Sequence, residues 1–356
     1  MSFLSEKARR LTPYVAGLQP KESGWIKLNT NENPYPPSPR VIEVIKNADI
    51  EKLRFYPDGE SGVLKTAIAG ALVIGEGKIF CANSSDEVLA LAFQAFFSGK
   101  KNVLTPNISY GFYPVWGEIY DVGLEFVALR EDFSINPDDC KSSNGVVIAN
   151  PNAPTSLALE LSDIEKILKQ NPNGVVLIDE AYIDFAQVES AVSLIDSYEN
   201  LLVVRTFSKS HSLAGLRVGY AMGQTALIDG LCRIRDAFNS YPLDMLAQNG
   251  AAAAISDTDY LKETSSRVIS TRKKTIEILT NLGFYVLPSQ ANFIFMKAGN
   301  AQKLYSFLLE NKILVRFWNK PILKDFLRVS IGTDDEMEVF CECVKRFLNE
   351  KQEKHS

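Results

Sequence analysis

The chain has 356 residues, 46% of them hydrophobic and 23% charged, and its formal net charge at pH 7 is −5. This length predicts a large core and two domains, and the composition is typical of globular proteins in water. Because acids and bases are interspersed and no run of 18 apolar residues occurs, the sequence argues against a basic nucleic-acid-binding face and a membrane span. The first seven residues contain no apolar core of a signal peptide, so we expect a cytoplasmic protein.

The cysteines and histidines argue against a metal centre. Of five cysteines only Cys341 and Cys343 are close in sequence, and two positions apart on a predicted helix they point to different faces. We therefore expect free thiols and no bound metal. With two histidines in the chain, a histidine-dependent triad is also disfavoured, and we interpret His211 as structural.

Residues 1–39 are predicted to form an extended arm. The segment 33–39 carries four prolines, which favour polyproline II backbone and prevent a helix, so a stiff linker is the simplest interpretation. Apolar residues at helical spacing follow over residues 40–48 and 61–74. The turn between these helices contains Tyr56, which by itself is best interpreted as a residue packed before a proline.

A polar segment at residues 81–87 precedes an apolar run. Ser84 and Glu87 have the spacing of a capping box, which predicts the start of a helix. A helix start offers free backbone N–H groups and a partial positive charge, so it can hold a phosphate, although a capped helix without a ligand is the more common case. The next predicted elements are a strand, a helix and a strand: residues 103–106, a helix that begins at 109–113, and residues 124–129.

Three apolar runs end in polar residues that suit an active site. Residues 145–149 lead into Asn150–Thr155, residues 174–178 into Asp179–Tyr182, and residues 201–204 into a segment with Lys209 and Arg217. Such runs predict central parallel strands, whose carboxyl ends form the ligand-binding edge of an open α/β sheet. A lone lysine is usually a solvated loop residue, but the position of Lys209 beside these strand ends favours a functional role.

The remaining elements complete an α/β fold with a smaller second domain. Alternating strands and helices predict βαβ units and a mostly parallel central sheet flanked by helices. We expect an arm over residues 1–39, a large domain over 40–256 and a smaller α+β domain over 257–356. Further helices are predicted at 225–235, 245–255 and 259–282, and further strands at 218–222, 292–296, 313–315 and 326–331.

Several segments together resemble a known enzyme family. Ser208–Arg217 fits S-K-x-x-x-L-A-G-L-R, Asp179–Tyr182 reads D-E-A-Y, and residues 151–155 read P-N-A-P-T. In this order they resemble the fold-type I enzymes that depend on pyridoxal 5'-phosphate (PLP), class II subgroup, and among these the histidinol-phosphate aminotransferases. The resemblance extends from residues 28–34 to 327–333. It implies a homodimer that transfers the amino group of L-histidinol phosphate to 2-oxoglutarate, giving imidazole acetol phosphate and L-glutamate in histidine biosynthesis.

The same resemblance implies roles for individual residues. Lys209 would hold PLP as a Schiff base and move the proton, Asp179 would keep the pyridine nitrogen protonated, and Tyr182 would bond the phenolate oxygen. The other implied cofactor contacts are the Ser85–Asp86 backbone, Tyr110 stacked on the ring, Thr206, Ser208, Arg217 at the phosphate, and Tyr56 from the partner subunit. The implied substrate contacts are Tyr14 at the phosphate and the anion-binding arginines Arg316 and Arg328.

One segment departs from the family pattern. The family reads P-N-N-P-T-G and uses its second asparagine to bond the phenolate oxygen, whereas this chain has Ala153 at that position and Ser156 in place of the glycine. Asn152 is the nearest amide and is our candidate substitute among the cofactor contacts. If Asn152 turns away, this role rests on Tyr182.

Other functions on the same scaffold stay open at this point. An aromatic amino-acid aminotransferase and a threonine-phosphate decarboxylase would share Lys209 and Asp179, so these residues do not discriminate between them. A PLP-sensing regulator would need a basic DNA-binding module, and the 39 residues before the first predicted helix leave no room for one.

Overall fold

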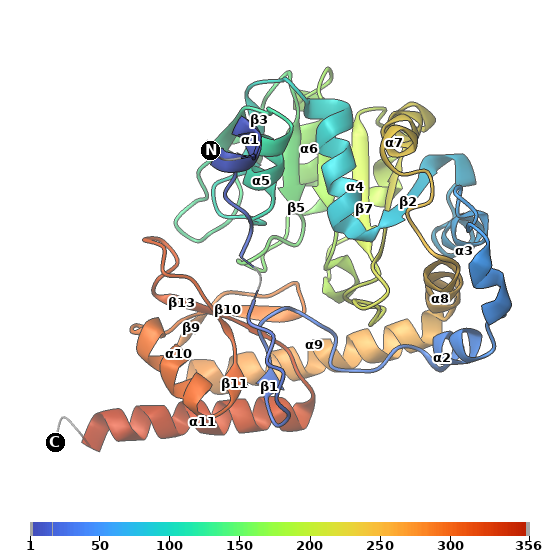
Figure 1. Ribbon diagram of the computed structural model, residues 1–356. Coiled ribbons are helices and arrows are strands. Elements are labelled where there is room, and N and C mark those ends of the chain that lie inside the picture. Colours follow the sequence, from blue (N-terminus) through green and yellow to red (C-terminus); the bar gives the residue numbers. More distant parts are fainter. Residues whose placement is uncertain (1–2, 16, 354–356) are drawn as a thin grey trace.

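The chain forms a larger and a smaller body, each built on its own β-sheet (Figure 1). The computed structural model describes residues 3–15 and 17–353. Its α-helices are α1 (Glu6–Arg10), α2 (Pro39–Lys46), α3 (Gly62–Leu72), α4 (Ser84–Ala92), α5 (Tyr113–Ile119), α6 (Leu161–Gln170), α7 (Thr225–Phe238), α8 (Met245–Ser256), α9 (Thr258–Asn281), α10 (Ala301–Glu310) and α11 (Asp334–Glu353). Its strands are β1 (Ile26–Lys27), β2 (Ile79–Asn83), β3 (Val103–Pro106), β4 (Leu124–Val127), β5 (Val146–Ala149), β6 (Val176–Asp179), β7 (Leu201–Thr206), β8 (Val218–Gly223), β9 (Tyr285–Val286), β10 (Phe293–Lys297), β11 (Ile313–Leu314), β12 (Arg316–Phe317) and β13 (Phe326–Ser330).

The larger body contains a seven-stranded sheet in the order β2-β8-β7-β6-β5-β3-β4. β8 runs antiparallel to both β2 and β7, and the other neighbouring pairs are parallel. This arrangement confirms the mostly parallel sheet that the sequence predicts. Strands β5, β6 and β7 are buried along their whole length, which explains why their sequences are nearly continuous apolar runs.

Helices cover both faces of this sheet (Figure 1). On one face Val147 and Leu177 pack with residues of α4, α5 and α7, and on the other face Ile148 and Ile178 pack with residues of α2, α3, α6 and α8. The two faces alternate because successive side chains of a strand point to opposite sides. With both faces covered, the polar side chains that follow the strands gather at the strand ends.

The strand register brings the predicted site segments to one edge. Ala149 of β5 lies beside Asp179 of β6, and Asp179 lies beside Val204 of β7. Thr206 of β7 lies opposite Gly219 of the antiparallel β8, so the loop 207–217 between them stands at the same edge. This loop carries both Lys209 and Arg217.

The smaller body contains an antiparallel sheet in the order β12-β13-β10-β9, packed with α9, α10 and α11. The predicted arm contributes to it, because Ile26 of β1 pairs in parallel with Ile313 of β11. The sequence did not indicate this pairing. The domain boundaries expected after residues 39 and 256 stay predictions.

Of two local predictions beside the larger sheet, one agrees with the structure only at the end of its range and the other is wrong. Helix α5 begins at Tyr113, the last residue of the predicted start at 109–113, and the preceding residues from 109 form a bend and a turn. Ser84 does not cap α4: its φ is 72°, and the Glu87 carboxylate instead accepts a hydrogen bond from the backbone nitrogen of Asn83 at 2.6 Å. The reciprocal bond of a capping box is therefore absent at this helix start.

All five cysteines are free, as expected. In the part of the chain that the structure describes, no helix combines the length and apolar character needed to cross a membrane. Within the same residues, histidine, cysteine, aspartate and glutamate side chains form no group of three that could hold a metal ion.

Candidate active site

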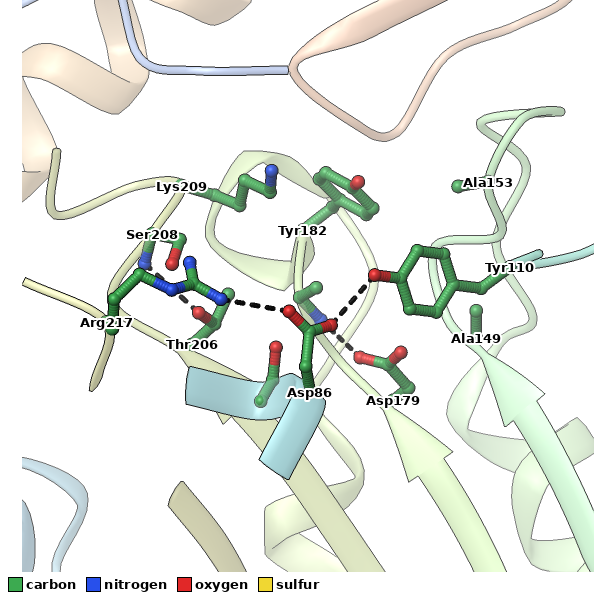
Figure 2. A pocket seen from close by; sticks show the side chains of 12 residues that line it. Asp86, Tyr110, Ala149, Ala153, Asp179, Tyr182, Thr206, Ser208, Lys209 and Arg217 are labelled. Carbon is green, nitrogen blue, oxygen red and sulfur yellow. Dashed lines mark hydrogen bonds and ion pairs between the residues drawn. The ribbon is translucent and has the colours of Figure 1, made fainter. Parts of the chain in front are cut away.

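A cavity opens at the carboxyl ends of β5, β6 and β7 (Figure 2). Its walls are Ser85, Asp86, Tyr110, Ala149, Ala153, Asp179, Ala181, Tyr182, Thr206, Ser208, Lys209 and Arg217. All the predicted cofactor contacts lie here except Asn152 and Tyr56. Lys209 and Asp179, which the sequence predicts to bind the same ligand, therefore border one cavity.

Lys209 is half-buried and has no acidic partner among the described ion pairs. Its Nζ donates to the backbone oxygen of Thr30, in the arm, at 3.2 Å and lies 5.9 Å from the centre of the Tyr182 ring. Burial and the nearby Arg328 cation lower the pKa of the Lys209 amine to about 8, although Asp86 opposes the shift. A useful fraction of the amine is then unprotonated near neutral pH and can act as a nucleophile or base.

Asp179 is a buried carboxylate held by two donors. Its Oδ2 accepts from the Tyr113 hydroxyl at 2.9 Å, and its Oδ1 accepts from the backbone nitrogen of Ala181 at 3.2 Å. Burial raises the pKa of Asp179 to about 6 despite these bonds. Since a buried anion is stabilised by a cation, this site fits the protonated nitrogen of a heterocycle.

Tyr113 is a residue of the site that the sequence argument did not assign. In the sequence it is a near neighbour of Tyr110, and no pattern indicates that it contacts Asp179, which is 66 positions away. Both rings are close, with centroids 5.6 Å apart, but only the Tyr110 side chain reaches the cavity wall. Tyr113 acts on the cavity through Asp179.

The end of the cavity near α4 combines an arginine with open backbone groups. Arg217 Nη2 pairs with Asp86 Oδ2 at 2.9 Å, and the Tyr110 hydroxyl donates to Asp86 Oδ1 at 2.8 Å (Figure 2). Helix α4 begins beside them without a side-chain cap. A Cβ at Gly219 would lie 2.2 Å from the backbone nitrogen of Ser85, so only glycine lets β8 approach this helix start. Free N–H groups and an arginine together fit a phosphate.

The structure contradicts the expected substitution by Asn152. Both amide hydrogens of Asn152 are used, on the Ile108 backbone oxygen at 2.9 Å and on Thr155 Oγ1 at 3.0 Å, and its Oδ1 accepts from Ser109 at 2.8 Å. These bonds hold the turn around Asn152 together and turn its side chain away from the cavity. The physical reason is that a buried amide forms hydrogen bonds with the groups nearest to it, and the spacing of residues in the sequence does not reveal these bonds.

A second cavity continues from the first and shares Tyr110, Ala153 and Tyr182 with it. Arg328 lies on its wall, with its guanidinium 5.3 Å from the ring centres of both Phe293 and Trp318. Its Nη2 donates to the Asn29 backbone oxygen at 2.8 Å, while its buried Nε has no hydrogen-bond partner in the described part of the chain. Burial lowers the pKa of Arg328. A half-buried cation with an unused donor beside a cavity fits an anionic ligand.

The other predicted substrate contacts differ in position. Tyr14 lines the second cavity and stacks on Phe112, with ring centres 4.3 Å apart. Arg316 is in register with Arg328 across β12 and β13 but lies outside this wall and donates to the Val15 backbone oxygen at 2.9 Å. Tyr56 is 83% exposed and borders neither cavity.

The sequence and the fold are similar to those of known proteins. Residues 23–344 match the model of the family of class I and II aminotransferases. The chain is 48% identical over 350 residues to a histidinol-phosphate aminotransferase of Clostridium botulinum (strain Langeland), covering 98% of this chain and 99% of the relative. It is 48% identical over 349 residues to that of Marinomonas sp. (strain MWYL1), covering 96% and 99%.

Among solved structures, the histidinol-phosphate aminotransferase of Sinorhizobium meliloti in complex with pyridoxal-5'-phosphate superposes with a TM-score of 0.87. The two chains are 23% identical, and the superposition covers 98% of this chain and 99% of the other. This likeness confirms the predicted fold class.

Proposed function

Since the chain belongs to the family of class I and II aminotransferases, we propose that it is a PLP-dependent histidinol-phosphate aminotransferase. Its reaction would convert L-histidinol phosphate and 2-oxoglutarate to imidazole acetol phosphate and L-glutamate, a step of histidine biosynthesis. The observation that carries the substrate assignment is 48% identity over 98% of the chain to a relative of that name. The reaction class is supported independently by the cavity that joins Lys209 to Asp179.

Bound PLP would supply an electron-withdrawing ring that acidifies the α-carbon of the amino substrate. Lys209 Nζ, with a pKa of about 8, would attach the cofactor and then accept the proton from that carbon. Asp179 would pair with the ring nitrogen, because the cation removes the cost of burying its charge. Tyr182 would donate to the ring oxygen, and Tyr110 would cover the ring.

The phosphate of PLP would lie between Arg217 and the start of α4. It would compete with Asp86 for Arg217, because two anions cannot share one arginine without repulsion. We therefore expect the Asp86 carboxylate to give up this ion pair when the phosphate binds.

The second cavity would take the anionic end of the substrate. Arg328 lies on its wall with an Nε that has no hydrogen-bond partner among the described residues, so it can bind the phosphate ester in one half-reaction and a carboxylate of 2-oxoglutarate or glutamate in the other. Tyr14 and Arg316 remain proposed contributors, Tyr14 from the cavity wall and Arg316 from the neighbouring strand.

A homodimer that acts in the cytoplasm is also part of the proposal. Tyr56 stacks on Tyr241 at 4.7 Å between ring centres, and large apolar residues beside it in sequence, Phe55 and Leu53, are 61% and 50% exposed. A second copy covering this patch would bury these residues and bring Tyr56 to the partner's cofactor. Sedimentation velocity of the wild-type protein and of Phe55→Glu tests the dimer, which the charge should weaken.

The substrate test compares amino donors on the PLP-loaded protein. Histidinol phosphate should be converted with a higher kcat/KM than phenylalanine or tyrosine, with glutamate formed from 2-oxoglutarate. Faster turnover of the aromatic amino acids would favour the aromatic aminotransferase, and carbon dioxide release from threonine phosphate would favour the decarboxylase. Lys209→Ala should lose both activity and the covalent cofactor absorbance.

A further inference from the structure

The wall between the two cavities offers few polar atoms to a ligand. Ala153 contributes none, and the neighbouring Asn152 has its amide hydrogens bonded elsewhere. The polar side chains on this shared wall are Tyr110 and Tyr182. Tyr110 donates its hydroxyl hydrogen to Asp86, which leaves the Tyr182 hydroxyl as the donor available there.

The contacts of Asn31 determine how the Tyr182 hydroxyl is oriented. Ser330 Oγ accepts from the backbone nitrogen of Asn31 at 2.8 Å and donates to Asn31 Oδ1 at 3.0 Å. The remaining amide atom, Nδ2, therefore faces the Tyr182 oxygen at 3.0 Å. Because an amide nitrogen only donates, the Tyr182 oxygen accepts this bond and its own hydrogen is free for another partner.

Asn31 is held firmly in this position. Its side chain is 1% exposed, and its backbone oxygen accepts from Asn292 Nδ2 at 2.9 Å. Its φ is 57°, in the left-handed region that asparagine adopts more readily than most residues. The preceding residue, Thr30, supplies the backbone oxygen that accepts from Lys209. The arm thus contacts two of the proposed catalytic side chains in succession.

We propose that Asn31 is a positioning residue that acts through Tyr182, directing the Tyr182 hydroxyl hydrogen to the anionic ring oxygen of the cofactor in place of an amide at position 153. This inference rests on the proposed function. Burial raises the pKa of Tyr182, whereas Arg328 and the hydrogen bond from Asn31 lower it. Asn31 therefore also makes Tyr182 a stronger donor, since a phenol of lower pKa donates more strongly.

The test is the pH at which the visible absorbance of the bound cofactor changes. Asn31→Gly removes the amide, and glycine adopts a positive φ without strain. A hydrogen bond to an anionic oxygen stabilises the deprotonated form of the cofactor. Its loss should raise the midpoint by about 0.5 to 1 pH unit, a roughly 3- to 10-fold change in the protonation equilibrium.

A double-mutant comparison separates this role from a structural one. Tyr182→Phe should raise the midpoint by itself, and adding Asn31→Gly should then change it by less than about 0.2 unit. Asn292→Ala is the matched control: it removes another bond to Asn31 but leaves the bond to Tyr182, so the midpoint should stay unchanged. An unchanged midpoint in Asn31→Gly, or an equal rise with and without Tyr182, overturns the proposal.

A second variant keeps the test decisive if Asn31→Gly does not retain the cofactor. Asn31→Asp preserves the size and the bond from Ser330 but replaces the donor with an acceptor. Asn31→Asp must raise the midpoint more when it is introduced into the wild-type protein than when it is introduced into Tyr182→Phe. An equal rise in both backgrounds, or no rise, overturns the inference. A wild-type protein that binds no PLP would refute the proposed function and, with it, this inference.

Discussion

The lowered pKa of Lys209 makes a quantitative prediction about its reactivity. An ordinary lysine has a pKa near 10.5, whereas burial and Arg328 bring Lys209 to about 8. At pH 7 roughly one Lys209 amine in ten is unprotonated, against about one in 3,000 for an ordinary lysine, a difference of about 300-fold. The shift therefore decides whether the amine can react at neutral pH.

The assay is acetylation of the apoprotein at a series of pH values, with Lys209 followed by mass spectrometry. Because burial also slows access of the reagent, the midpoint of the rate profile is the measured quantity, with Lys52, whose side chain is 65% exposed, as the reference. The midpoint for Lys209 should lie near pH 8. A rate that still rises without a plateau above pH 10 would refute the reasoning.

Two neutral substitutions should move this midpoint in opposite directions. Arg328→Met removes a cation that lowers the pKa of Lys209, so the midpoint should rise. Glu32→Gln removes an anion that raises it, so the midpoint should fall. Each change should stay within about one unit, because burial is the largest cause of the shift. Shifts of the same sign in both variants would show that these charges do not act on Lys209.

Three further predictions concern cofactor binding, substrate binding and stability. Tyr113→Phe should raise the pKa of Asp179 further above its ordinary value, and loss of a hydrogen bond to a charged group, about 1.5–3 kcal/mol, should weaken PLP binding roughly 10- to 150-fold in a fluorescence titration. Arg328→Met should raise the KM for histidinol phosphate about tenfold or more in steady-state kinetics while PLP affinity changes little; equal KM values would remove its assigned role. Gly219→Ala should destabilise the protein by about 1–3 kcal/mol and lower its Tm, because the added Cβ meets the start of α4 at 2.2 Å, whereas Gly215→Ala, which meets nothing within 4 Å, should not.

The strand ends and their polar residues were predictable because each combines a buried apolar run with a polar turn. This pattern located Lys209, Asp179 and Tyr182, and parallel pairing then brought them to one edge. The direction of β8 was not predictable, since its composition suits a parallel or an antiparallel neighbour equally.

Side-chain orientation was the part that sequence could not supply. Asn152 has the right chemistry and sequence position, but the bonds of its own turn use its amide. Tyr113 and Asn31 reach their partners across 66 and 151 positions, and such contacts leave no periodic signal. The pairing of β1 with β11 involves two residues on each strand, too few to produce a recognisable pattern.

The attachment of the arm has a practical consequence for shortened versions of this protein. A fragment that starts at residue 39, where α2 begins, would keep every strand of the seven-stranded sheet. It would nevertheless lack the oxygen that accepts from Lys209 and the amide that faces Tyr182, and β11 would have lost its neighbour. Removing the arm to aid crystallisation would therefore yield a protein whose seven-stranded sheet is complete but whose Lys209 and Tyr182 side chains have lost the hydrogen bonds that hold them in place.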